Sequence, residues 1–90
     1  MPASATSLHI LYFAWLKDRL GRGEDNLDLP AGVVDVAGLR AWLRASDPAF
    51  EGIFNAGGRV RAAVNQKFAG DGTPVRGGDE VAFFPPVTGG

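Results

Sequence analysis

The sequence predicts an α+β domain in which a mixed β-sheet wraps around one main helix. Three observations support this prediction. Apolar stretches with a two-residue period recur along the chain, as half-buried strands require. One segment, residues 36–45, has the apolar spacing of an amphipathic helix. The 90 residues are enough for one small domain with a single hydrophobic core.

Two strands separated by a helical turn are predicted at the start of this domain. Residues 8–14 combine aliphatic and aromatic side chains that suit a pleated, half-buried surface. A short helical turn follows over residues 15–20 and ends at Gly21. A second strand is predicted over residues 26–29, and it ends at Pro30, which has no N–H for a strand ladder.

Alternation along the first strand predicts which side chains reach the core. Leu8, Ile10 and Tyr12 share one face, which we expect to be buried. His9, the single histidine, falls on the opposite face and is expected to be exposed. One histidine in a chain without cysteine cannot form a histidine or thiolate metal site unaided, so no metal is expected.

The main helix has clear signals at both ends. Asp35 is the predicted N-cap, because its carboxylate can accept from the free N–H groups of the first turn. Ser-Asp-Pro at residues 46–48 ends the helix, since a residue before proline avoids helical geometry. We expect Arg40 and Arg44 on the solvent side. The predicted buried stripe consists of Val36, Leu39 and Leu43, widened by Trp42.

Three further strands are predicted after one loose turn at residues 49–55. The strand at residues 60–65 ends in an Asn-Gln turn, and Phe68 is expected to anchor a short return strand. The last strand spans residues 80–84, with Val81 and Phe83 inward and Ala82 and Phe84 outward. The pattern allows a few arrangements of these elements, and a β-grasp is the simplest of them.

Composition excludes several classes of function. The 9 Lys and Arg residues balance 10 Asp and Glu residues, which argues against a nucleic-acid binder held by phosphate contacts. No apolar stretch approaches the ~20 residues of a membrane helix, and residues 1–7 lack the basic start of a signal peptide. A cytoplasmic location is therefore expected. The carboxylates are dispersed over turns, so paired acid–base catalysis is not predicted.

The C-terminal segment carries the most distinctive chemistry. Pro85-Pro86 stops strand pairing and keeps the chain stiffly extended, and residues 85–90 can reach about 20 Å. The chain ends in Gly89-Gly90, whose lack of side chains allows close approach to another protein's active site. Phe84 directly precedes this tail, and we call Phe84, Pro85 and Pro86 the tail root. Phe84 is either an interface anchor or a residue packed at the edge of the core. The glycines alone leave a loose tail possible.

A terminal carboxylate must be activated before it can react. It is anionic at neutral pH, with a pKa near ~3.5, and is a poor electrophile. The simplest activation is an acyl-adenylate made with ATP, from which an amine forms an amide and a sulfur donor forms a thiocarboxylate. In either case the protein is a carried substrate and not an enzyme, in keeping with its lack of a catalytic constellation.

Two segments resemble a known family. Residues 62–66 (AAVNQ) and 78–90 (GDEVAFFPPVTGG) closely resemble the small, sulfur-carrier subunit of molybdopterin synthase (MoaD), and residues 11–14 (LYFA) are similar to its first strand. The resemblance implies a ubiquitin-like β-grasp domain over residues 8–84. It leaves residues 1–7 as an N-terminal extension, expected to be disordered, and residues 85–90 as an extended C-terminal tail.

The resemblance also implies a reaction cycle in molybdenum cofactor biosynthesis. Gly90 would be adenylated by an E1-like adenylyltransferase that consumes ATP, and a sulfur donor protein would then supply the thiocarboxylate. Val87, Thr88 and Gly89 would line a channel in the large catalytic subunit of molybdopterin synthase. There the sulfur would pass to cyclic pyranopterin monophosphate, with two carriers serving each dithiolene.

The remaining implications concern docking and assembly. The resemblance assigns the docking surface for the large subunit to Phe84, Pro85 and Pro86. It implies a heterotetramer in which the large subunit supplies the catalytic groups, and no permanently bound cofactor in this chain. Three alternatives stay open. One is a ubiquitin-like modifier conjugated to lysines through Gly90, and another is a thiazole-synthesis sulfur carrier, whose tail generally lacks the Phe-Phe-Pro-Pro run. The third is a plain β-grasp binding module, for which the tail would be incidental.

Overall fold

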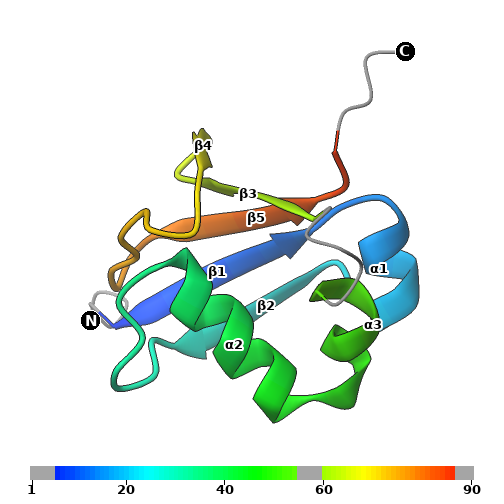
Figure 1. The fold of residues 1–90 in the computed structure, drawn as a ribbon, viewed down its shortest axis with the longest axis horizontal. Helices are drawn as coiled ribbons and strands as arrows, with labels where there is room; N and C mark the ends of the chain where they lie inside the picture. The colour runs from blue at the N-terminus through cyan, green and yellow to red at the C-terminus, as the bar shows by residue number, and fades with distance from the viewer. Residues whose placement is uncertain (1–5, 55–59, 87–90) are drawn as a thin grey trace.

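The chain folds as a β-sheet with its helices gathered on one side (Figure 1). A computed structural model describes residues 6–54 and 60–86. A 3₁₀ turn over Pro48–Phe50 directly precedes the last helix. The helices are α1 (Trp15–Leu20), α2 (Val36–Ser46) and α3 (Glu51–Phe54). The strands are β1 (Ser7–Tyr12), β2 (Glu24–Asp28), β3 (Arg61–Val64), β4 (Lys67–Ala69) and β5 (Glu80–Phe84).

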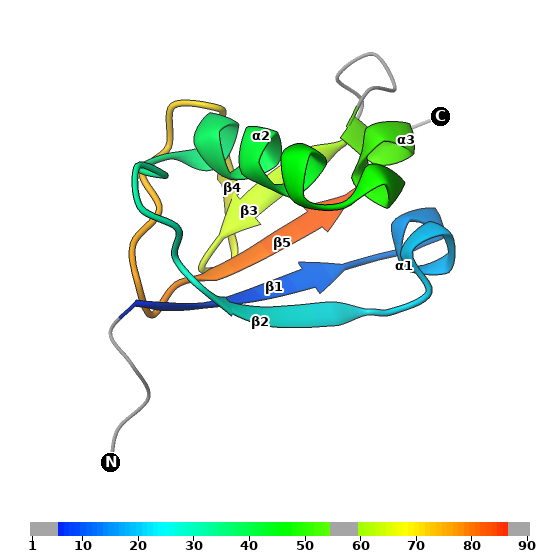
Figure 2. The same ribbon diagram turned by 90° about the horizontal axis from the view of Figure 1, so that it is seen from below.

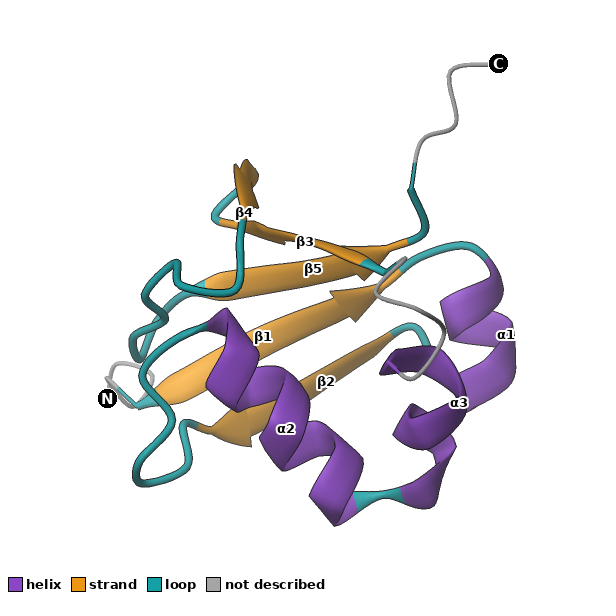
Figure 3. Ribbon diagram, viewed as in Figure 1, coloured by secondary structure: helices purple, strands orange, loops and turns teal. Residues whose placement is uncertain are grey.

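The sheet is mixed, with the strand order β2-β1-β5-β3-β4. The central pair, β1 and β5, is parallel, and the other three pairs are antiparallel. The first and last strands of the fold therefore lie side by side in the middle of the sheet, and α2 crosses one face of it (Figure 3). This arrangement confirms the predicted α+β, β-grasp architecture.

Helix α2 begins and packs as its sequence predicts. The Asp35 carboxylate accepts a hydrogen bond of 2.8 Å from the Gly38 N–H, which satisfies one donor of the first turn. Val36, Leu39 and Leu43 are buried against the sheet. Seen from below, α2 lies across the strands with its axis oblique to β1 (Figure 2). The N-cap and the apolar stripe together orient this helix.

Aromatic rings fill one end of the core. Tyr12 of β1 stacks on Phe83 of β5, with ring centroids 6.4 Å apart. Phe54 meets Phe83 edge to face at 5.0 Å and stacks on Phe50 at 5.7 Å. Such pairs stabilise a fold by about 0.5–1.5 kcal/mol beyond the area they bury. The rings join the C-terminal ends of β1 and β5 to α3 and the 3₁₀ turn.

Arg40 contradicts its prediction as a solvent-facing residue of α2. Its guanidinium lies over the rings of Phe54 and Phe83, 5.4 and 5.5 Å from their centroids, and its side chain is mostly buried. Nε lies 3.3 Å from the Asp71 carboxylate, which makes an ion pair without a hydrogen bond. Burial lowers the pKa of Arg40, and the Asp71 charge opposes this shift. Cation–π contact with the core rings explains the inward position.

The structure corrects two predicted boundaries. Ser7, predicted to belong to a disordered extension, is the first residue of β1 and pairs with Asp28. Its carbonyl accepts from the Gly78 N–H, so pairing on both sides holds it in the sheet. Strand β2 begins at Glu24, two residues before the prediction, because the ladder with β1 continues through the acidic residues. Residues 1–5 of the predicted extension lie outside the described residues.

No helix in the described part of the chain is long and apolar enough to cross a membrane. Within residues 6–54 and 60–86, no group of three or more histidine or carboxylate side chains is placed to hold a metal ion.

Tyr12 connects the core to a polar cluster of Arg22 and Asp25 at the start of β2. Its hydroxyl donates to the Asp25 carboxylate over 2.8 Å, and Arg22 donates to the same carboxylate over 2.8 Å. The Arg22 guanidinium also lies over the rings of Tyr12 and Phe50. Burial, followed by the hydrogen bond to Asp25, raises the pKa of Tyr12 far above its ordinary value. The folded protein therefore holds the phenol proton strongly.

Alkaline titration tests this cluster, because Tyr12 is the only tyrosine of the chain. The unfolded chain loses the phenol proton near pH ~10, whereas the folded chain keeps it, so the folded state should lose stability as the pH rises above that value. We expect phenolate absorbance to appear together with the loss of circular dichroism. The urea-unfolded chain is the control. Ionisation near pH ~10 with the circular dichroism intact would contradict the proposed burial.

Candidate functional site

The structure describes only part of the predicted site. Phe84 is the last residue of β5, and Pro85 and Pro86 follow it outside the sheet. The remaining predicted site residues lie outside the described residues: Val87, Thr88, Gly89 and Gly90. The described site is therefore the tail root and the sheet surface around it.

The tail root is held from both sides because β5 is a central strand. Phe84 pairs with Arg61 of β3, and Phe83 pairs with Tyr12 of β1. The Phe83 carbonyl also accepts from the Phe13 N–H over 3.1 Å. The two prolines that follow cannot donate to a ladder, so pairing stops at a fixed place. The chain leaves the sheet from a rigid base.

An apolar row crosses the sheet face that points away from α2, which we call the outer face. Strand register places Leu11, Ala82, Ala63 and Phe68 in consecutive positions on β1, β5, β3 and β4. The core-facing neighbours of these residues alternate with them along each strand, as the burial pattern of β1 and β5 shows. The outer face is thus apolar without contributing to the core.

Phe68 is the most exposed large apolar side chain of the described residues. It is 86% exposed, and its ring lies 6.0 Å from the Phe84 ring on the same face. The prediction that Phe68 anchors its strand is therefore wrong. A register signal was present in the sequence: a two-residue turn at Asn65 and Gln66, both with positive φ, fixes Phe68 opposite the outward Ala63. An exposed aromatic pair of this kind is typical of an interface.

The chain after β1 adds two rings at the end of the sheet that carries the tail root. Phe13 is 48% exposed and Trp15 is 36% exposed. Ala14 between them adopts φ 59° and ψ −135°, and the Phe13 carbonyl accepts from the Leu16 N–H across this tight turn. A non-glycine residue in this conformation costs about 1–3 kcal/mol. The sequence did not indicate the place of Phe13 beside the tail root, which depends on the pairing of β1 with β5.

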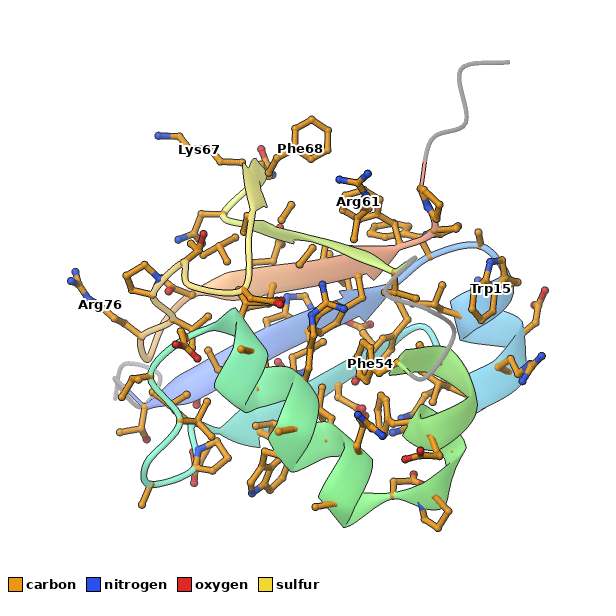
Figure 4. All side chains as sticks on the ribbon, viewed as in Figure 1. Trp15, Phe54, Arg61, Lys67, Phe68 and Arg76 are labelled. Atoms are coloured by element: carbon orange, nitrogen blue, oxygen red, sulfur yellow. The ribbon has the colours of Figure 1, made fainter. Side chains whose placement is uncertain are left out.

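Charged residues frame the apolar part of the outer face unevenly. Arg61 pairs with Phe84 and lies beside the end of β5 on the outer face, whereas Lys67 points to the opposite side of β4 from Phe68 (Figure 4). At the opposite end of the face, His9 hydrogen-bonds to Glu24 and lies 3.9 Å from Glu80. The apolar region near the tail root is therefore flanked by the basic Arg61, which suits a partner with an apolar centre and an acidic group at its rim.

The fold and this surface define a ubiquitin-like β-grasp protein whose central last strand leads into a proline-stiffened tail root. Residues 10–90 match the family model described as the ThiS family, so the chain belongs to that family.

Relatives with established names agree with this assignment. The chain is 36% identical to the molybdopterin synthase sulfur carrier subunit of Escherichia coli (strain K12) over 83 residues, which cover 92% of this chain and 99% of that protein. Among solved structures, it is similar to small archaeal modifier protein 1 of H. volcanii, with a TM-score of 0.75 and 28% identity over 91% of this chain and 99% of the other.

A third comparison is with a complex. The structure of subunits 1 and 2 of molybdopterin-converting factor from Helicobacter pylori contains a similar chain. The TM-score is 0.61 and the identity 26%, with 93% of this chain and 99% of that chain covered. Together with the family match, these relatives confirm the resemblance to molybdopterin synthase sulfur-carrier subunits.

Alanine substitution of one exposed and one buried phenylalanine tests whether Phe68 on the outer face contributes to the stability of the fold. Phe68→Ala should change the free energy of unfolding by less than about 0.5 kcal/mol, because the ring is almost fully exposed. Phe50→Ala, the same chemical change at a buried ring, should cost about 3–5 kcal/mol. Urea denaturation measures both. Similar losses for the two variants would show that Phe68 supports the fold.

Proposed function

We propose that this protein is a sulfur carrier in molybdenum cofactor biosynthesis, acting as the small subunit of a molybdopterin synthase. The observation that carries the proposal is the match to the E. coli sulfur carrier subunit across 99% of that protein's length. The family match reaches Gly90, so it includes the terminal glycines. The described surface supports the proposal, because it offers an apolar docking face beside a rigid tail root.

The proposed cycle takes place on the Gly90 carboxylate. A carboxylate oxygen attacks the α-phosphorus of ATP, which releases pyrophosphate and leaves an acyl-adenylate. The terminal sulfur of a persulfide on a donor protein then attacks the acyl carbon, and AMP leaves from an acyl disulfide that joins the two proteins. A thiol attacks the donor's sulfur in this disulfide, forms a new disulfide with the donor and releases the thiocarboxylate. The thiocarboxylate sulfur displaces an oxygen leaving group from a carbon of the pterin precursor and forms a thioester. Water then hydrolyses the thioester, which leaves the thiol on the pterin and restores the Gly90 carboxylate. Two such carriers supply the two sulfur atoms of one dithiolene.

The outer face is the proposed docking surface for the large subunit. Phe84 and Phe68 form its aromatic centre, and Arg61 provides the basic flank. Pro85 and Pro86 then direct the tail into the partner, where Val87, Thr88 and Gly89 occupy a narrow channel. The catalytic groups belong to the large subunit, so this chain acts as a non-catalytic donor.

The other proposed partners follow from the chemistry of the terminus. Adenylation requires an E1-like enzyme that binds ATP and reaches Gly90, and thiocarboxylate formation requires a sulfur donor protein. The carrier itself needs no resident cofactor. Because these steps use ATP, we place the cycle in the cytoplasm.

Removal of Gly90 tests the proposal in cells that lack the native gene. The variant without Gly90 should give no molybdenum-enzyme activity, because the reactive carboxylate no longer reaches the acceptor. Gly72→Ala is the control, since a Cβ at this surface turn meets no atom within 4 Å. The control should restore activity fully. Full activity from the variant without Gly90 would refute the carrier function.

One observation favours a second function, that of a protein modifier. The structural neighbours from H. volcanii are named small archaeal modifier protein 1, with 28% and 30% identity in two structures. The same adenylate can react with a lysine amine as readily as with a sulfur donor. Intact-mass analysis of protein isolated from its native cell separates the two functions. A carrier gains the mass difference between sulfur and oxygen, whereas a modifier appears in higher-mass conjugates.

A further inference from the structure

Strand β2 has an open edge on the side of the molecule away from the outer-face rings. Among the residues that the structure describes, β2 pairs only with β1. Gly23 accepts from the Tyr12 N–H, and the Leu29 N–H donates to Thr6. By the alternation of an antiparallel ladder, the backbone groups of Glu24, Asn26 and Asp28 then point to the open side. These groups can pair with an added strand.

A groove lies directly beside this edge, between β2 and the C-terminal part of α2. It encloses about 270 Å³. Buried Leu43 and Phe50 contribute to its lining, as do Asp47 and Leu27. Trp42 of α2 also lines it and is 37% exposed, which departs from its predicted role in the buried stripe. A strand added to β2 would direct alternate side chains into this groove, which we call the β2 groove.

The charges around the β2 groove select the side chains that it would accept. Asp25 and Asp47 face Arg22 at 2.8 and 3.8 Å, and Arg22 is the only base lining the groove. Asp28 on the same edge pairs with Ser7, so its carboxylate lies on the outer face and does not line the groove. The surroundings are thus acidic beside an exposed indole. A Lys or Arg side chain can place its stem on that ring and its charge near Asp47.

The carboxylates along the edge of β2 disfavour a second copy of this chain as the occupant. In an antiparallel β2–β2 pairing centred on Asn26, Glu24 of each copy would face Asp28 of the other. Like charges directly opposite one another destabilise a strand pair. Acidic residues on this edge therefore protect it from self-association while leaving it open to a basic strand.

We propose that the β2 groove binds an extended segment of a partner protein that carries Lys or Arg at alternate positions and adds to β2 as a further strand. Figures 1 and 2 show β2 at the margin of the sheet opposite β4. The β2 groove is therefore separate from the Phe68–Phe84 surface, and a partner can occupy it while the tail root is engaged. The inference does not depend on the sulfur-carrier function.

Amide NMR of the ¹⁵N-labelled full chain with synthetic peptides tests this proposal. The probe is a capped seven-residue peptide of alternating Val and Lys, and the matched control replaces each Lys with Glu. Shift changes should be confined to residues 22–28 and 42–50. The Glu peptide should bind at least about tenfold more weakly, and added salt should weaken binding of the Lys peptide.

Three variants separate the contributions of backbone and charge. Asn26→Pro removes an N–H at the open edge and should abolish binding. Asp47→Asn should weaken binding about threefold, because one charge attraction is lost. The asparagine at position 47 can still cap the 3₁₀ turn, where Asp47 now accepts from the Ala49 N–H. Asp18→Asn, at an exposed acid on α1, is the charge control and should leave binding unchanged.

Each contrary result overturns the proposal. Equal binding of the Lys and Glu peptides would exclude charge selection, and shift changes centred on β4 would place the site at the other edge. Unchanged binding by a folded Asn26→Pro variant would exclude strand addition. Dimerisation of the chain through β2 near neutral pH, detected by sedimentation, would make a second copy the occupant.

Discussion

The parallel pairing of β1 with β5 is the constraint on which the rest of the structure depends. It brings the first and last strands of the fold into the middle of the sheet. Tyr12 and Phe83 then stack beneath the sheet, while Phe84, one residue further, lies on the outer face at the tail root. A tail attached to a central strand has a rigid base, whereas a tail attached to an edge strand would move with that edge.

Because side chains alternate between the two faces of the sheet, the residues that stabilise the fold and those open to a partner lie on opposite faces. The inward residues of β1 and β5 are buried, and the outward residues near the tail root, Leu11, Ala82 and Phe84, form an apolar surface that the core does not need. Exposure of an aromatic pair on a monomer is unfavourable unless a partner covers it. The outer face and the edge of β2 are both open to a partner, but their chemistry differs. The outer face is apolar with a basic flank, whereas the edge of β2 is polar with an acidic rim.

Local signals predicted much of the fold, and tertiary contacts decided the rest. The Asp35 cap, the α2 stripe and the inward positions of Val81 and Phe83 follow from spacing alone. The inward turn of Arg40 could not be predicted, because it depends on rings from α3 and β5 meeting above that position. The prolines and Phe84 marked the tail root, whereas recognising Phe68 as their neighbour required the register of the β3–β4 hairpin.

In the proposed complex, the outer face and the tail root dock onto the large subunit. Hydrogen–deuterium exchange of the full chain, alone and with a molybdopterin synthase large subunit, tests this docking most directly. We expect slower exchange on binding in residues 61–69 and 82–90, with residues 24–28 and 36–46 unchanged. Protection centred on β2 and α2, with residues 82–90 unaffected, would contradict the account.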